Sequence, residues 1–149
     1  MKKILLILIL LLSNCGYQPI YTNKNLVEFE FSNVKFIGEK DINRLILNSL
    51  SIKEKSDKNL NELLVKSDLE IEETSKDSKG KVQTYRMIID LELSIIKNKE
   101  ILKKKIIKES FSYNNQNNKF ELIEYETEIK ENIVKKIIEE ISLYLNLQW

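Results

Sequence analysis

The sequence predicts an α+β fold, in which a four-stranded, mostly antiparallel or mixed sheet has two helices packed on one face. Three observations lead to this class. Apolar and polar residues alternate from Tyr85 to Ile95, which is the period of a half-buried strand. Apolar residues recur at helical spacing from Phe120 to about Asn146. The element order β-α-β-β-β-α then lets two amphipathic helices cover one face of a single sheet.

The first strand and the first helix follow one another in the N-terminal third of the chain. Apolar alternation starts at Val27, slips at Ser32 and resumes at Val34, which predicts a bulged strand. Asp41 is a candidate N-cap, because its carboxylate can accept a hydrogen bond from a free backbone N–H of the first turn. Apolar residues at helical spacing after it predict a helix of about three turns.

A charged connector at residues 53–61 leads into the central part of the sheet. The chain becomes strand-like again from Leu63. The segment at residues 76–81 contains Asp, Ser and Gly and gives the clearest turn signal in the chain. The strand that follows, around residues 85–95, has the strongest alternation of apolar and polar residues in the chain.

The last third of the chain is predicted to hold a hairpin and a long helix. Residues 97–100 are short enough for a tight turn, so residues 101–113 return as the final strand. A polar loop at residues 114–118 precedes the helix. Its apolar stripe is wide and has Glu and Lys opposite. It consists of Ile129, Ile133, Val134, Ile137, Ile138, Ile141, Tyr144 and Leu145.

Composition limits the chemistry that the chain can perform. A length of 149 residues supports one domain, which we place at residues 26–149. The absence of histidine excludes a Ser-His-Asp triad and an imidazole metal ligand. A single cysteine excludes an intramolecular disulfide. The 24 basic residues nearly balance the 23 acidic ones, so the chain lacks the excess positive charge that is typical of nucleic-acid-binding proteins. A carboxylate-only active site remains possible, but the acidic residues form no recognisable constellation. We expect no enzyme activity, cofactor, metal or nucleic-acid partner.

The N-terminus has the features of a secretion signal. A basic start, Met1-Lys2-Lys3, precedes nine consecutive Ile and Leu residues at positions 4–12. That run is too short to span a bilayer as a helix, which needs about 20 apolar residues, but it matches a signal-peptide core. The alternative is a buried strand or helix, which would need every side of the run to face a core. We therefore predict a signal peptide at residues 1–14.

The only cysteine follows this segment. Leu12-Ser13-Asn14-Cys15 resembles a bacterial lipobox, although Asn14 differs from the usual Gly, Ala or Ser. Lipidation of Cys15 would give stable anchoring, since each buried CH₂ contributes about 0.8 kcal/mol. The alternative is an inert buried thiol. Residues 15–25 would form the lipidated tether, and Gly16, in place of the Asp typical of inner-membrane retention, favours the outer membrane.

Lysines gather at the second hairpin. Residues 97–108 contain six lysines and one glutamate. One interpretation is an anion site formed by Lys103, Lys104, Lys105 and Lys108. The other is an edge strand that lysines protect against edge-to-edge pairing. Strand alternation places Lys103 and Lys105 on one face and the other two on the opposite face, so they cannot all contact one ligand.

Residues 15–21, CGYQPIY, carry a family resemblance. They resemble the Cys-Gly-aromatic-x-Pro-aliphatic-Tyr opening of the LPS-assembly lipoprotein LptE family, particularly its alphaproteobacterial branch. The chain length, the element order and Tyr113-Asn114 before the final helix agree with that family. No binding residue of the family can be carried over by motif.

This resemblance implies a non-enzymatic subunit of the lipopolysaccharide translocon. Such proteins plug the LptD barrel of the outer membrane, assist its assembly and bind lipopolysaccharide on its way to the outer leaflet. The implied partners are an LptD-type barrel and lipopolysaccharide, and the lysine cluster gains weight as a lipopolysaccharide site. Two alternatives remain: an unrelated periplasm-facing lipoprotein that binds a peptide or an anion, and a lipid-anchored enzyme that uses carboxylates.

Overall fold

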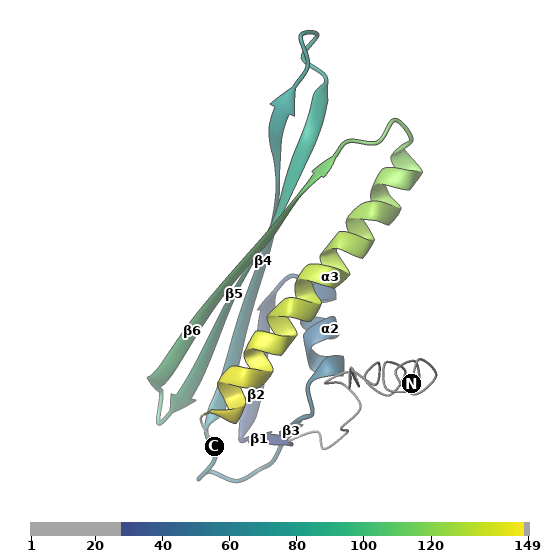
Figure 1. Ribbon diagram of the computed structural model, residues 1–149. Coiled ribbons are helices and arrows are strands. Elements are labelled where there is room, and N and C mark those ends of the chain that lie inside the picture. The colour runs from purple at the N-terminus through teal and green to yellow at the C-terminus, as the bar shows by residue number, and fades with distance from the viewer. Residues whose placement is uncertain (1–27, 148–149) are drawn as a thin grey trace, which may run out of the picture.

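A mixed four-stranded sheet, covered on one face by two helices, forms the body of the molecule (Figure 1). The computed structural model describes residues 28–147. The elements in chain order are β1 (Phe29–Phe31), β2 (Asn33–Gly38), α2 (Lys40–Ser49), β3 (Ile52–Glu54), β4 (Glu62–Lys76), β5 (Val82–Lys97), β6 (Glu100–Asn114) and α3 (Lys119–Asn146). The predicted α+β class is confirmed.

The large sheet has the strand order β2-β4-β5-β6. β4, β5 and β6 form an antiparallel meander, and β2 pairs parallel to β4 because α2 carries the chain back before β4 begins. The β5–β6 turn is a two-residue loop in which Asn98 and Lys99 both have positive φ, as the tightest hairpin turns require. The predicted meander and its hairpin are therefore confirmed.

The first strand differs from its prediction. Ser32 is not a bulge within one strand; it is the point where the chain leaves a small two-stranded sheet and enters the large one. Before it, β1 pairs parallel with β3; after it, β2 pairs with β4. The residues 53–61 predicted as a connector thus begin inside β3. Local sequence could not show this, because Lys53 and Glu54 pair with a distant strand and have no apolar alternation of their own.

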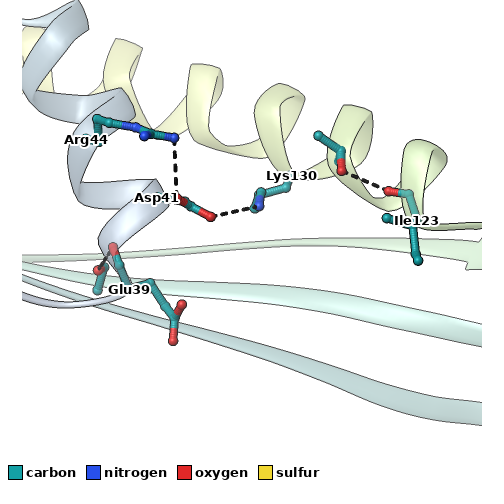
Figure 2. A network of polar contacts seen from close by, with 7 residues as sticks. Glu39, Asp41, Arg44, Ile123 and Lys130 are labelled. Atoms are coloured by element: carbon teal, nitrogen blue, oxygen red, sulfur yellow. Dashed lines mark hydrogen bonds and ion pairs between the residues drawn. The ribbon is translucent and has the colours of Figure 1, made fainter.

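The first helix also begins differently. Its N-cap is Glu39, whose side chain makes no capping bond, so the prediction of Asp41 as N-cap is wrong. Asp41 lies in the first turn, and its carboxylate forms ion pairs with Arg44 (Nη2 to Oδ1, 3.4 Å) and with Lys130 of α3 (Nζ to Oδ2, 3.8 Å) (Figure 2). Its carboxylate still favours the helix start by opposing the helix dipole. It also connects the two helices to each other.

A close backbone contact fixes the turn between β2 and α2. Gly38 has φ +98°, and a Cβ added there would lie 1.8 Å from the backbone carbonyl oxygen of Ser67 in β4. Only glycine fits such a position. The Ser67 carbonyl accepts a bond from the N–H of Glu39 at 3.3 Å, and the Ser67 hydroxyl bonds to Asn43 Oδ1 at 2.8 Å. α2 is therefore held on the sheet at its first turn.

The core lies between the helices and the inner face of the sheet. β5 supplies alternate apolar residues from Met87 to Ile95, and α3 presents its predicted stripe to them. Within that stripe, Ile138 and Tyr144 are only partly buried, and the other members are fully buried. Among residues 28–147, no helix is long and apolar enough to cross a membrane. The buried stripe of α3 and the Glu and Lys residues on its other side make it an amphipathic helix that covers the sheet.

Candidate functional site

The lysines of β6 lie on two faces of the sheet, as strand alternation predicts. Lys103 and Lys105 pair in register with the core residues Ile95 and Leu93, so they are on the face that α3 covers. Lys104 and Lys108 are on the outer face, which no helix covers. The structure therefore does not bring the four lysines together into one anion site.

The two outer lysines already bind carboxylates of the neighbouring strand. Lys104 Nζ lies 2.8 Å from Glu92 Oε2, and Lys108 Nζ lies 2.9 Å from Asp90 Oδ2. The hydrogen bond from Lys104 lowers the pKa of the Glu92 carboxyl, and the bond to Asp90 raises the pKa of Lys108. An anion that binds these ammonium groups must therefore compete with the carboxylates of β5.

The inner lysines lie near the C-terminal half of α3. Lys105 Nζ is 3.6 Å from Glu140 Oε2, in a pair whose two side chains are 40% and 43% exposed. A pair this exposed adds little stability, since water screens it. It does place an ammonium group at the junction between the edge of the sheet and the helix.

The first hairpin does not join this site. Lys79 and Lys81 belong to the β4–β5 turn, which lies at the opposite end of the sheet from the β5–β6 turn (Figure 1). Lys81 Nζ instead donates to Asn117 Oδ1 at 2.9 Å, beside the start of α3. The two lysine groups therefore lie at different ends of the sheet, because successive turns of a meander alternate between its ends.

A groove between β6 and α3 is the feature that sequence reasoning missed. The volume of this open groove is about 530 Å³. Its apolar lining consists of Phe111, Tyr125, Ile129 and Ile133, and its polar rim includes Lys136. The sequence showed each residue as part of a strand or a helix, but the space between them arises only when α3 packs against the sheet. Phe111 is 46% exposed in this groove, so about half of its surface is accessible to a ligand.

An aromatic cluster closes one end of this region. The ring of Tyr113 stacks on Tyr85 at a centroid distance of 5.7 Å and meets Tyr125 edge-on at 6.0 Å. The Tyr113 hydroxyl donates to Glu126 Oε1 at 2.6 Å. Burial and this carboxylate both raise the pKa of Tyr113, so the phenol stays protonated and acts as a structural hydrogen-bond donor.

Within the part of the chain that the structure describes, no group of three or more His, Cys, Asp or Glu residues is placed to hold a metal ion. The predicted signal peptide at residues 1–14, the predicted lipidation site Cys15 and the whole predicted tether at residues 15–25 lie outside the described residues. What the described part offers is a pair of surfaces: a lysine–carboxylate ladder on the outer face, and a groove on the inner one.

The fold is similar to that of several solved bacterial lipoproteins. Rare lipoprotein B from Shewanella oneidensis aligns over 78% of this chain and 99% of its own, with 19% identity and a TM-score of 0.53. A minor lipoprotein from Acinetobacter baumannii covers 80% and 94%, with 6% identity and a TM-score of 0.55. Lipoprotein B from Nitrosomonas europaea covers 87% and 94%, with 12% identity and a TM-score of 0.53.

This chain has the fold of those lipoproteins. No family model matches the sequence, and no curated protein matches it either. These structures agree with the fold that the resemblance to LptE-type lipoproteins implies, and identities this low show the fold alone. The alphaproteobacterial branch stays a prediction.

The ladder on the outer face gives a pH-dependent prediction. The native pKa of Glu92 lies below its unfolded value, so its pairing stabilises the fold above the unfolded pKa and is lost as pH falls through the native one. We expect the difference in unfolding free energy between wild type and Glu92→Gln to be largest near neutral pH and to shrink toward pH ~3. Urea denaturation at several pH values measures it.

The control is Glu131→Gln, which changes an exposed glutamate on α3 away from the sheet. Its effect on the unfolding free energy should be small throughout. A Glu92→Gln effect that stays constant with pH would contradict the ladder as the source of this stability.

Proposed function

We propose that this protein is an outer-membrane lipoprotein subunit of the lipopolysaccharide translocon. It would plug an LptD-type barrel, assist its assembly and help to deliver lipopolysaccharide to the outer leaflet. The observation that carries the proposal is the agreement of two independent features: the CGYQPIY segment at residues 15–21 and the fold shared with rare lipoprotein B. One is local sequence near the N-terminus, and the other is the arrangement of residues 28–147.

The proposed location follows from the anchor. A signal peptide, a lipidated Cys15 and Gly16 after it would hold the protein on the periplasmic side of the outer membrane. α3 packs its apolar stripe on the sheet and has charged residues along its exposed side. In this proposal the lipid on Cys15 supplies the attachment to the membrane.

Lipopolysaccharide would be recognised through its phosphates and sugar carboxylates. The proposed contacts are Lys103, Lys104, Lys105 and Lys108, which now divide into two pairs on opposite faces. The outer pair, Lys104 and Lys108, is the candidate tested below because its face of the sheet is not covered by the helices of residues 28–147, so a large ligand can approach both ammonium groups (Figure 1). The ligand must displace Glu92 and Asp90 from them. A charge-assisted bond from ammonium to phosphate would replace the bond to carboxylate. The role is one of binding and support, without catalysis.

The alternative is an unrelated periplasm-facing lipoprotein that binds a peptide or an anionic ligand. The groove between β6 and α3 is the observation that favours it, since an apolar lining with a charged rim suits an extended peptide. The two functions differ in whether a large barrel protein is a stable partner.

Affinity purification tests the barrel. We expect the tagged, full-length protein, extracted from outer membranes in mild detergent, to bring down one large β-barrel protein in equimolar amount. An unrelated tagged outer-membrane lipoprotein is the control and should not recover it. Absence of a stoichiometric barrel partner would remove the translocon proposal and leave the alternative.

Metabolic labelling tests the anchor. With an alkyne analogue of palmitate, the wild-type protein should incorporate label, and Cys15→Ala should not, because its side chain has no thiol to acylate. Fractionation should show the variant released from the outer membrane. Label on the Cys15→Ala protein would show that the anchor lies elsewhere.

Lipopolysaccharide binding tests the lysines. The double variant Lys104→Ala/Lys108→Ala should bind lipopolysaccharide about fivefold more weakly, since each exposed charge contact contributes about 0.5 kcal/mol. Lys79→Ala/Lys81→Ala removes the same charge at the other end of the sheet and should have little effect. Equal losses in both variants would mean that net charge alone governs binding, and would contradict a site on β6.

A further inference from the structure

One edge of the sheet is open. β6 is the last strand in the order β2-β4-β5-β6, and within residues 28–147 no further strand pairs with its far side. An open edge presents a row of unpaired backbone N–H and C=O groups, to which another strand can bond. At 15 residues, β6 is long for an edge.

The register shows which residues of β6 present these groups. The N–H of Asn115 donates to the carbonyl oxygen of Gln83 at 2.8 Å. Bonded and non-bonded pairs alternate along an antiparallel ladder, and the register runs without a shift from Thr84–Asn114 to Ile95–Lys103. Odd-numbered residues of β6 from 103 to 113 therefore bond to β5. Even-numbered residues from 104 to 112 direct their backbone groups to the open edge.

The usual protection of an edge is weak here. Lysines protect an edge when an incoming strand would leave their charges without a partner. Lys104 and Lys108, however, are bound sideways to carboxylates of β5, and Lys105 to Glu140 of α3. Between them Ile106 is 62% exposed. The charges are thus turned toward their own sheet and helix, and the backbone edge stays accessible.

The groove lies directly beside this edge. A strand added to β6 would place every second side chain on the face of α3, in the space lined by Phe111, Tyr125, Ile129 and Ile133. These four residues form the apolar part of the lining, and Glu128, Lys135, Lys136 and Glu139 of α3 also line the groove. The turn-proximal half of β6 instead carries Lys103 and Lys105 on the same face. An edge strand with an adjacent helix groove is the arrangement that proteins use for strand addition, with main-chain bonds for affinity and pockets for selectivity.

We propose that the open edge of β6 binds one extended strand of another polypeptide, antiparallel to β6. Its inward side chains are apolar beside Phe111 and acidic beside Lys103 and Lys105, where they compete with Glu140 for the Lys105 ammonium group. Because β6 runs from the lysines toward Phe111, the apolar half of this strand is N-terminal and its acidic half is C-terminal. The proposal concerns the surface that receives a polypeptide and does not depend on the partner proposed above.

A synthetic peptide of ten residues tests this. It alternates valine and threonine, and glutamate replaces valine in its C-terminal half. With the full-length protein in detergent, we expect amide hydrogen exchange at even-numbered residues 104–110 to slow at least tenfold when the peptide is added. Those amides should exchange rapidly without it, since they have no partner in the ladder to β5.

The variant Ser110→Pro removes one of these outward N–H groups without removing a bond to β5. It should weaken peptide binding at least tenfold, whereas Ser110→Ala, which keeps the N–H, should bind as wild type does. Near-ultraviolet circular dichroism confirms that both variants are folded. If Ser110→Pro is misfolded, Phe111→Ser, which removes the apolar contact, takes its place with the same expectation.

Three results would overturn the proposal: no binding of the peptide, protection of amides outside β6, or unchanged affinity of the folded variants. A fourth contrary result would come from sedimentation of the protein alone: a dimer formed through β6 would show that the edge binds a second copy of this chain. None of these results alters the recovery of a barrel protein, so the strand proposal and the translocon proposal fail separately.

Discussion

The packing of α3 on the inner face of β5 is the contact on which the rest of the structure depends. Ile137 and Ile141 are fully buried there, opposite the alternate apolar residues of the central strand. Burying side chains of this size contributes about 1.5–3 kcal/mol each, more than any of the exposed ion pairs can supply. α2 adds to this layer through Ile42 and Ile46 and is connected to α3 through Asp41 and Lys130.

The same packing creates both candidate surfaces. Because the helices cover only one face, the outer face of the sheet is left to charged pairs such as Lys104 with Glu92. Because β6 is the last strand, no further strand closes the space beside it, and α3 and the sheet edge form a groove there. One layer of helices on a sheet therefore leaves a ladder of lysine–carboxylate pairs on the outer face and a groove at the edge. Both follow from the packing of α3 on the sheet.

The lysines show how structure changes the meaning of a charge run. In the sequence, six lysines within residues 97–108 were open to two interpretations, an anion site or a protected edge. The structure divides the proposed set between two faces and gives Lys104, Lys105 and Lys108 carboxylate partners. The lysines therefore do not form a single anion site, and these three are paired with carboxylates. The backbone edge of β6 stays accessible, and any anion must compete with the protein's own carboxylates.

Local patterns were sufficient for the class of fold, the meander and the stripe of α3, because strand and helix periods are written in neighbouring residues. The predictions of a signal peptide and a lipobox, and the family resemblance, also rest on local sequence and need no tertiary contact. They failed at Ser32, at β3 and at Asp41, where pairing with distant segments decides the outcome. Only the tertiary structure decided that Gly38 must approach Ser67, that β2 is parallel to β4, and that Phe111 stays half-exposed beside α3. The physical reason is that these features belong to pairs of elements, and the residues of one element alone do not contain them.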